Sequence, residues 1–125
     1  MRILLDTHFL LWWLLDDPVL GDRGRELIST PENLIFFSAA SIWEMRIKQG
    51  IGKLDLPEDF ADVLAGEAFE SLAITVEHTH ALLGLPLLHR DPFDRLLIAQ
   101  ARLERLTLLT RDHIISQYGV PTLLA

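Results

Sequence analysis

Short apolar runs alternate with helix-length segments along the whole chain, and this alternation is the feature that most restricts its fold. A short apolar run such as Arg2–Leu5 (RILL) is typical of a strand that a parallel sheet buries on both faces. Parallel strands need long crossover connections, which are usually helices packed on the faces of the sheet. We therefore predict an α/β fold with three layers, α/β/α, around a central parallel sheet of about four to five strands.

The boundaries of the predicted elements follow from apolar periodicity and from capping and turn residues. Ser38 is a good cap for the helix after it, and Asp91 followed by Pro92 is a strong helix start. The predicted strands are Arg2–Leu5, Asn33–Phe37, Ala73–Thr75, Leu106–Thr110 and Pro121–Leu124. The predicted helices are His8–Leu15, Asp22–Ser29, Ala39–Gln49, Pro57–Phe69, Glu77–Leu83, Asp91–Leu106 and Asp112–Tyr118. We expect one domain over residues 1–125.

Composition excludes several classes of function. The chain has no cysteine, which rules out thiol catalysis and zinc–thiolate sites and fits a reducing cytoplasm. Its longest apolar run, Phe9–Leu15, has seven residues, whereas a membrane helix needs about 20, so we expect no membrane association. A net charge of −7 argues against binding nucleic acid through a broad basic patch. The mean hydropathy of +0.26 predicts a partner or oligomer interface.

Four acids from distant parts of the chain are predicted to meet at one edge of the sheet. Asp6 directly follows the first strand, and Asp112 follows the strand that ends at Thr110. Glu44 lies in the helix that starts after the second strand, and Asp94 lies in the first turn of the helix that starts at Asp91. In open α/β sheets the ligand binds beyond the carboxyl ends of the strands, where the strand order reverses.

Taken singly, each acid also has an ordinary structural interpretation. An Asp after a strand is usually a cap or a turn residue, which would suit Asp6 and Asp112. Glu44 could pair with Lys48 one helical turn later, and Asp94 could complement the helix dipole. The combination is more informative, because clustered carboxylates repel one another unless a divalent cation lies among them. Oxygen ligands without cysteine or paired histidines favour Mg²⁺ or Mn²⁺.

The chain resembles the PIN-domain ribonucleases, and specifically the VapC-like toxins of bacterial toxin–antitoxin pairs. Four stretches carry the resemblance, which covers nearly the whole length. They are Leu4–Pro18 (LLDTHFLLWWLLDDP), Ser38–Pro57 (SAASIWEMRIKQGIGKLDLP), His89–Ala101 (HRDPFDRLLIAQA) and Leu106–Asp112 (LTLLTRD).

The resemblance implies a PIN-like fold and a Mg²⁺-dependent endoribonuclease, with Mn²⁺ as an alternative ion. It assigns catalytic roles to Asp6, Glu44, Asp94 and Asp112, and the metal ligands would be Asp6, Asp94 and Asp112. It also implies RNA as the substrate, a homodimer, and a small antitoxin protein whose C-terminal segment covers the groove and the acidic pocket.

Several neighbouring residues keep more than one interpretation. Thr7 and Thr110 look like hydroxyls that hold a carboxylate or a metal-bound water, and His89 could be a general base or a loop residue near the site. The candidate contacts to the RNA backbone are Arg46, Lys48, Lys53, Arg90, Arg95 and Arg111. Two rival functions also remain open at this stage: a receiver-like phosphoacceptor module and a non-catalytic interaction domain.

Overall fold

The computed structural model describes residues 1–125 and contains one five-stranded sheet in the order β3-β2-β1-β4-β5. All four pairings are parallel. The strands are β1 (Arg2–Leu5), β2 (Leu34–Ser38), β3 (Glu70–Leu72), β4 (Thr107–Thr110) and β5 (Thr122–Leu124). The chain builds outwards from β1 to β2 and β3, and then returns to the other side of β1 to add β4 and β5. The strand order therefore reverses between β1 and β4, where a ligand site is expected.

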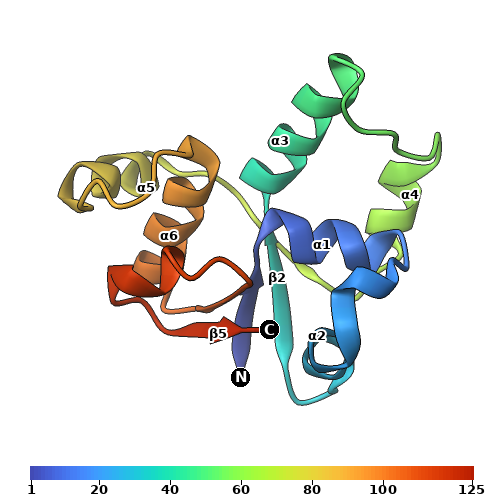
Figure 1. Cartoon of the computed structure of the whole chain (residues 1–125), viewed down its shortest axis with the longest axis horizontal. Coiled ribbons are helices and arrows are strands. Elements are labelled where there is room, and N and C mark those ends of the chain that lie inside the picture. Colours follow the sequence, from blue (N-terminus) through green and yellow to red (C-terminus); the bar gives the residue numbers. More distant parts are fainter.

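Helices cover both faces of the sheet, so the predicted three-layer α/β/α architecture is confirmed (Figure 1). Successive strand residues alternate between two buried clusters, as the two-residue period of a strand requires. Leu4 and Leu108 pack on the side of α6 (Pro92–Glu104), whereas Leu5 and Leu109 pack on the side of α1 (Thr7–Leu14). Also present are α2 (Gly21–Ser29), α4 (Phe60–Ala65) and α5 (Val76–Ala81), with 3₁₀ turns at η1 (Pro18–Leu20), η2 (Leu82–Gly84) and η3 (Ile115–Tyr118).

Helix α3 (Ala39–Gly50) packs against both α1 and α6 and extends beyond the carboxyl edge of the sheet (Figure 1). Its start is fixed by Ser38, as predicted. The Ser38 Oγ accepts a hydrogen bond from the Ala40 N–H at 3.0 Å and donates one to Oε1 of Gln100 at 2.6 Å. Because Gln100 lies in α6, one fully buried hydroxyl group joins the two helices beside that edge.

The start of α6 is also as predicted. The Asp91 Oδ1 accepts hydrogen bonds from the N–H groups of Phe93 and Asp94, and Pro92 occupies the first helical position. The helix ends at Glu104 rather than at Leu106, because Arg105 takes a left-handed conformation with φ of 56°. That turn leads the chain directly into β4.

The segment between α3 and α5 differs most from the prediction. The helix expected over Pro57–Phe69 covers only Phe60–Ala65, since a separate turn precedes it and Gly66 ends it. The strand expected over Ala73–Thr75 lies instead at Glu70–Leu72, where it pairs with β2. Thr75 is unavailable for a strand because it forms a capping box with His78 at the start of α5. The last expected helix, Asp112–Tyr118, is only the 3₁₀ turn η3. None of the helices is both long enough and apolar enough to span a membrane.

We expect Ser38→Ala to lower the free energy of unfolding by about 2–3 kcal/mol, because a helix cap is lost and the buried Gln100 Oε1 loses its donor. Denaturant titration measures this change. Ser29→Ala is the matched control, since its exposed hydroxyl bonds only within its own helix and should change stability by less than about 0.5 kcal/mol. Equal stability of wild type and Ser38→Ala would contradict the role given to this hydroxyl group.

Candidate active site

The carboxyl ends of β1 and β4 bring Asp6 and Asp112 together through Thr110. Asp6 is only 5% exposed, and its Oδ1 caps α1 by accepting from the Phe9 N–H at 2.9 Å. Its Oδ2 accepts a hydrogen bond from the Thr110 hydroxyl at 2.6 Å. The same hydroxyl oxygen accepts from the Asp112 N–H at 3.1 Å. The structure therefore confirms the predicted cap and the predicted proximity, and Thr110 is the hydroxyl that holds a carboxylate.

Asp94 reaches the same place from the first turn of α6. His89 lies between it and Asp112: the Nε2 of its ring is 3.2 Å from Oδ2 of Asp94 and 2.7 Å from Oδ2 of Asp112. One ligand atom from each of these three side chains lies within 4.8 Å of the other two. The sequence had placed His89 only in a nearby loop, and nothing in its spacing indicated that it joins two of the acids.

Glu44 approaches from α3 and is 6% exposed, so it is not an ordinary surface acid. The predicted pair with Lys48 is present, with the Lys48 Nζ 2.8 Å from Oε2 of Glu44. Thr7 does not hold a carboxylate: its hydroxyl donates to Oγ of Ser41, a buried residue that sequence reasoning missed. This bond joins the start of α1 to α3 and helps to place the Glu44 helix.

The shifted pKa values reflect burial together with repulsion between acids of the site. Burial, followed by the negative charge of Asp91, raises the pKa of Asp94 to about 7. Asp6 and Glu44 add to this increase, whereas His89 opposes it. Burial likewise raises the pKa of Asp6, against the hydrogen bond from Thr110. The pKa of Asp112 is lowered overall: its slight burial acts to raise it, but the hydrogen bond from His89 and the Ile114 N–H outweigh that effect.

This set of side chains fits a hard divalent cation. Its donors are carboxylate oxygens on separate chain segments, and burial together with nearby acids raises the pKa of Asp94, so the surrounding side chains do not fully stabilise its ionised form. Mg²⁺ and Mn²⁺ prefer such oxygen donors. Of the acids predicted as metal ligands, Asp94 and Asp112 lie in one group with His89. The third, Asp6, lies beside them, joined to Asp112 through the Thr110 hydroxyl.

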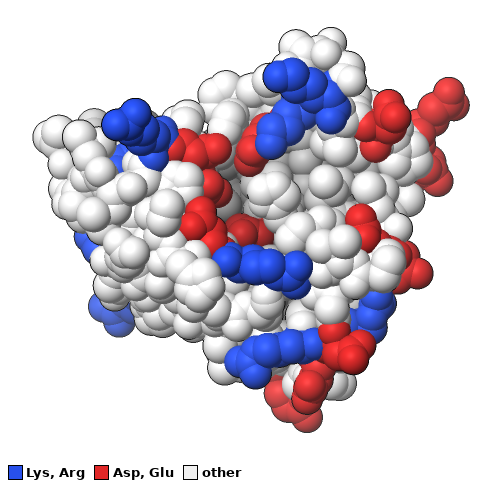
Figure 2. All heavy atoms as spheres, viewed as in Figure 1, with Lys and Arg blue, Asp and Glu red and all other residues white.

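Acidic atoms gather in a hollow between α3 and α6, and basic side chains lie around it (Figure 2). Two of the predicted RNA contacts, Arg95 and Arg111, have guanidinium groups that already donate to backbone carbonyls. Arg111 donates to the carbonyls of Val19, Leu20 and Ala125. Arg95 donates to the carbonyls of Leu82 and Pro86. Arg46, Lys48, Lys53 and Arg90 remain as candidates.

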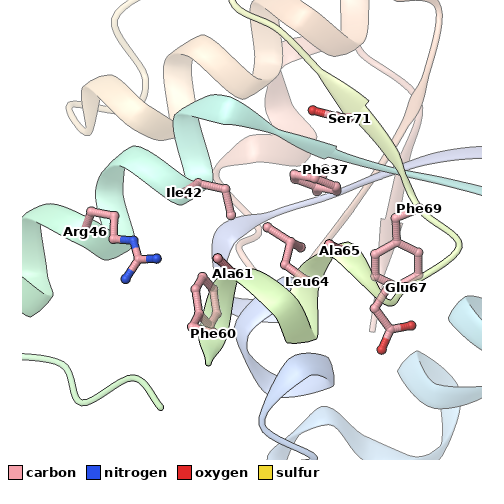
Figure 3. A pocket seen from close by; sticks show the side chains of 10 residues that line it. All are labelled: Phe37, Ile42, Arg46, Phe60, Ala61, Leu64, Ala65, Glu67, Phe69 and Ser71. Atoms are coloured by element: carbon pink, nitrogen blue, oxygen red, sulfur yellow. The ribbon is translucent and has the colours of Figure 1, made fainter. Parts of the chain in front are cut away.

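A second hollow, of about 350 Å³, lies away from the acids, between α3, α4 and the β2–β3 edge of the sheet. Figure 3 shows apolar side chains lining it, with Arg46 on α3 and Glu67 after α4 as its charged groups. The guanidinium of Arg46 lies over the ring of Phe60, 5.1 Å from the centroid. The lining residues are Phe37, Ile42, Arg46, Phe60, Ala61, Leu64, Ala65, Glu67, Phe69 and Ser71.

A parallel sheet with an acidic cluster at the point of strand reversal defines an α/β domain with a candidate ligand site at the carboxyl edge of the sheet. The particular family follows from sequence. The model of the PIN domain matches residues 3–121, so the chain belongs to the PIN-domain family. PIN domains are nucleases, which makes a hydrolase acting on nucleic acid the class of this protein and leaves the receiver-like alternative without support.

Solved structures share the fold at low sequence identity, and no curated protein matches the chain in sequence. VapBC2 from Rickettsia felis, bound to a DNA fragment from its promoter, superposes with a TM-score of 0.75 at 19% identity, covering 99% of this chain and 98% of that one. FitAcB from Neisseria gonorrhoeae gives 0.69 at 20% identity, covering 96% and 95%. VapBC-5 from Mycobacterium tuberculosis gives 0.60 at 16%, covering 99% and 98%. The resemblance to VapC-like PIN domains is thereby confirmed.

When a chelator removes divalent ions, we expect the free energy of unfolding to fall as the pH rises from about 4 to about 7. The folded Asp94 has a pKa of about 7, above its value of 3.8 in an unfolded chain, so in this range the native state holds a proton that the unfolded state releases. Asp94→Asn should flatten this slope and stabilise the chelator-treated protein at pH 8 by on the order of 1–3 kcal/mol, a figure reduced for partial exposure.

Denaturant unfolding across this pH range measures the effect. Asp55→Asn is the matched control, because Asp55 is exposed and lies outside the cluster. If the free energy of unfolding of Asp94→Asn changes with pH as steeply as that of wild type, Asp94 is not the acid that causes the pH dependence.

Proposed function

We propose that this chain is a Mg²⁺-dependent endoribonuclease and the toxin of a VapBC-type toxin–antitoxin pair, with Mn²⁺ as an alternative ion. The observation that carries the proposal is a cluster of acids at one edge of the sheet in a chain of the PIN-domain family, where burial, followed by the charges of Asp91, Asp6 and Glu44, raises the pKa of Asp94 to about 7. A chain that only bound partners would not need this cluster, which costs stability at neutral pH.

Each acid has a role that follows from how it is held. Asp6, Asp94 and Asp112 bind the cation, and Glu44 completes the site and orients the attacking water. The bound ion supplies Lewis acidity, which favours ionisation of that water and stabilises charge on the phosphate oxygens. The chain itself supplies rigid ligands: Thr110 and the Phe9 N–H fix both oxygens of Asp6, and Lys48 holds Glu44. Asp94, whose pKa burial and nearby charges raise to about 7, would hold the ion through its ionised carboxylate.

The RNA strand would cross the carboxyl edge of the sheet between α3 and α6. The basic side chains that remain free of carbonyl contacts lie mainly on and just after α3, where Arg46, Lys48 and Lys53 could contact phosphates. With a net charge of −7, the chain cannot gain much affinity from general attraction to nucleic acid. Binding would therefore depend on the ion, which locally reverses the sign of the site.

The purified protein should cleave single-stranded RNA only when Mg²⁺ or Mn²⁺ is present. Asp6→Asn and Asp94→Asn should each lower the cleavage rate on the order of 100-fold or more, because each removes a charged ligand. Asp55→Asn should cleave at the rate of wild type, since it lies outside the cluster. Cleavage of a labelled RNA followed on a denaturing gel measures this, and full activity of both cluster variants would defeat the assignment.

We also propose two protein partners. The similar solved structures include toxin–antitoxin complexes, and the apolar hollow between α3 and α4 offers a seat for an antitoxin segment. That segment would be apolar where it enters the hollow and partly basic around it, since the chain is acidic overall. A homodimer would bury exposed apolar side chains on α3 and directly after it, among them Trp43, Ile47 and Ile51.

Light scattering after size exclusion tests both partners. The chain alone should have twice its 14.2 kDa mass, and Ile47→Glu should return it to a monomer. Co-expression with the antitoxin of the same operon should add a second protein to the peak. Leu64→Arg, which fills the hollow with charge, should remove that protein while leaving the dimer intact. A monomeric wild type would refute the proposed dimer. A complex that persists in Leu64→Arg would refute the hollow as the binding site of the antitoxin.

A further inference from the structure

His89 stands between two of the proposed cation-binding acids, which come from different parts of the chain. Its Nε2 lies 2.7 Å from Asp112, which follows β4, and 3.2 Å from Asp94 in α6. The ring is 15% exposed, so it is largely enclosed by the site. Three roles are open to a histidine in this place: a cation ligand, a general base, or a hydrogen-bond donor that positions the acids.

The other nitrogen of the ring decides among these roles. The Asp91 N–H points at Nδ1 of His89 at 3.1 Å and donates to it. Nδ1 must therefore present its lone pair, and a neutral ring then carries its hydrogen on Nε2. A hydrogen on Nδ1 would set two donors face to face. The ring is also anchored through its backbone, because the His89 N–H donates to the Tyr118 hydroxyl at 2.7 Å.

A protonated Nε2 has no lone pair with which to bind a cation or to accept a proton from water. We propose that His89 is a positioning residue, whose Nε2–H holds Asp112 and Asp94 at the spacing that the cation requires, and that it is neither a ligand nor a base. This inference rests on the proposed cation site and adds a residue to it.

The contacts of the two acids show why they need such a donor. Asp112 has Oδ1 fixed by the Ile114 N–H at 2.9 Å, and His89 fixes its Oδ2. The Asp94 carboxylate accepts no hydrogen bond from a side chain, so its contact with the Nε2 of His89 at 3.2 Å is what opposes its repulsion from the nearby charge of Asp91. His89 is thus the one side chain that contacts both acids.

The position of the ring hydrogen can be observed directly by long-range ¹H–¹⁵N NMR on ¹⁵N-labelled wild type. We expect the Nε2–H tautomer of His89 both in chelator and with saturating Mg²⁺. A hydrogen on Nδ1 in either condition, or a ¹⁴N coupling from His89 to bound Mn²⁺ in pulsed electron paramagnetic resonance, would overturn the inference in favour of a ligand or a base.

Two substitutions separate the nitrogens of the ring. His89→Gln places an amide N–H near the position of Nε2, whereas His89→Asn keeps only the acceptor near the position of Nδ1. Calorimetric titration with Mn²⁺ should give a Kd for His89→Gln within about threefold of wild type, and a Kd for His89→Asn that is weaker on the order of 10–100-fold. Equal affinity in all three proteins, or equal losses in both variants, would refute the positioning role.

Melting temperatures of the two variants in chelator show whether a loss of affinity is only a loss of fold. If His89→Asn melts as His89→Gln does, the difference in affinity belongs to the donor. The same titration separates this inference from the proposed function. If wild type fails to bind Mn²⁺, the proposed cation site is wrong and the role of His89 falls with it. If wild type binds but the variants do not differ, only the role of His89 is wrong.

Discussion

Repulsion among four carboxylates at one edge of the sheet is the constraint on which the rest of the site depends. Acids this close raise one another's pKa values and favour the neutral forms, which bind cations poorly. The protein opposes this with fixed donors. Asp6 receives two hydrogen bonds, Asp112 receives one from the backbone and one from His89, and Glu44 receives one from Lys48. Burial raises the pKa of both Asp6 and Asp94, and of the two only Asp94 lacks hydrogen bonds to its carboxylate, where the contact with His89 is its one close partner.

The topology explains how side chains so far apart in sequence are held together. Strands β1 and β4 lie side by side at the point where the strand order reverses, which places Asp6 and Asp112 next to each other. The other two acids are on helices that converge over this edge. Ser38 and Gln100 tie α3 to α6, and Thr7 and Ser41 tie α1 to α3. These buried hydroxyl and amide bonds have fixed partners, so they set the spacing of the acids more rigidly than apolar packing alone would.

Local signals in the sequence predicted most of the helices and strands. Contacts between residues far apart in the chain could not be predicted from it. Caps such as Ser38 and Asp91 act within a few residues, so both helix starts were predicted correctly. Strand β3 was predicted too far along the chain. The pairing of Glu70–Leu72 with β2 outweighs the β-propensity of Ile74, and Thr75 caps the next helix. The contacts of His89 and Ser41 depend on residues 23 and 34 positions away, and no spacing rule reveals such partners.

The two arginines that neighbour the acids in sequence show how the site keeps its charge. Arg95 follows Asp94 and Arg111 precedes Asp112, so each could have neutralised the acid beside it. Instead both guanidinium groups donate to backbone carbonyls, and Arg111 also lies over the Trp12 ring, 4.7 Å from its centroid. Carbonyl acceptors satisfy a guanidinium without cancelling a carboxylate, so these side chains brace the loops beside the site while the acids remain uncompensated. Lys48 alone among the lysines and arginines pairs with the cluster, and its side chain is 44% exposed, where solvent weakens the attraction. Because neither arginine pairs with the acid beside it, the site retains negative charge that a divalent ion can balance.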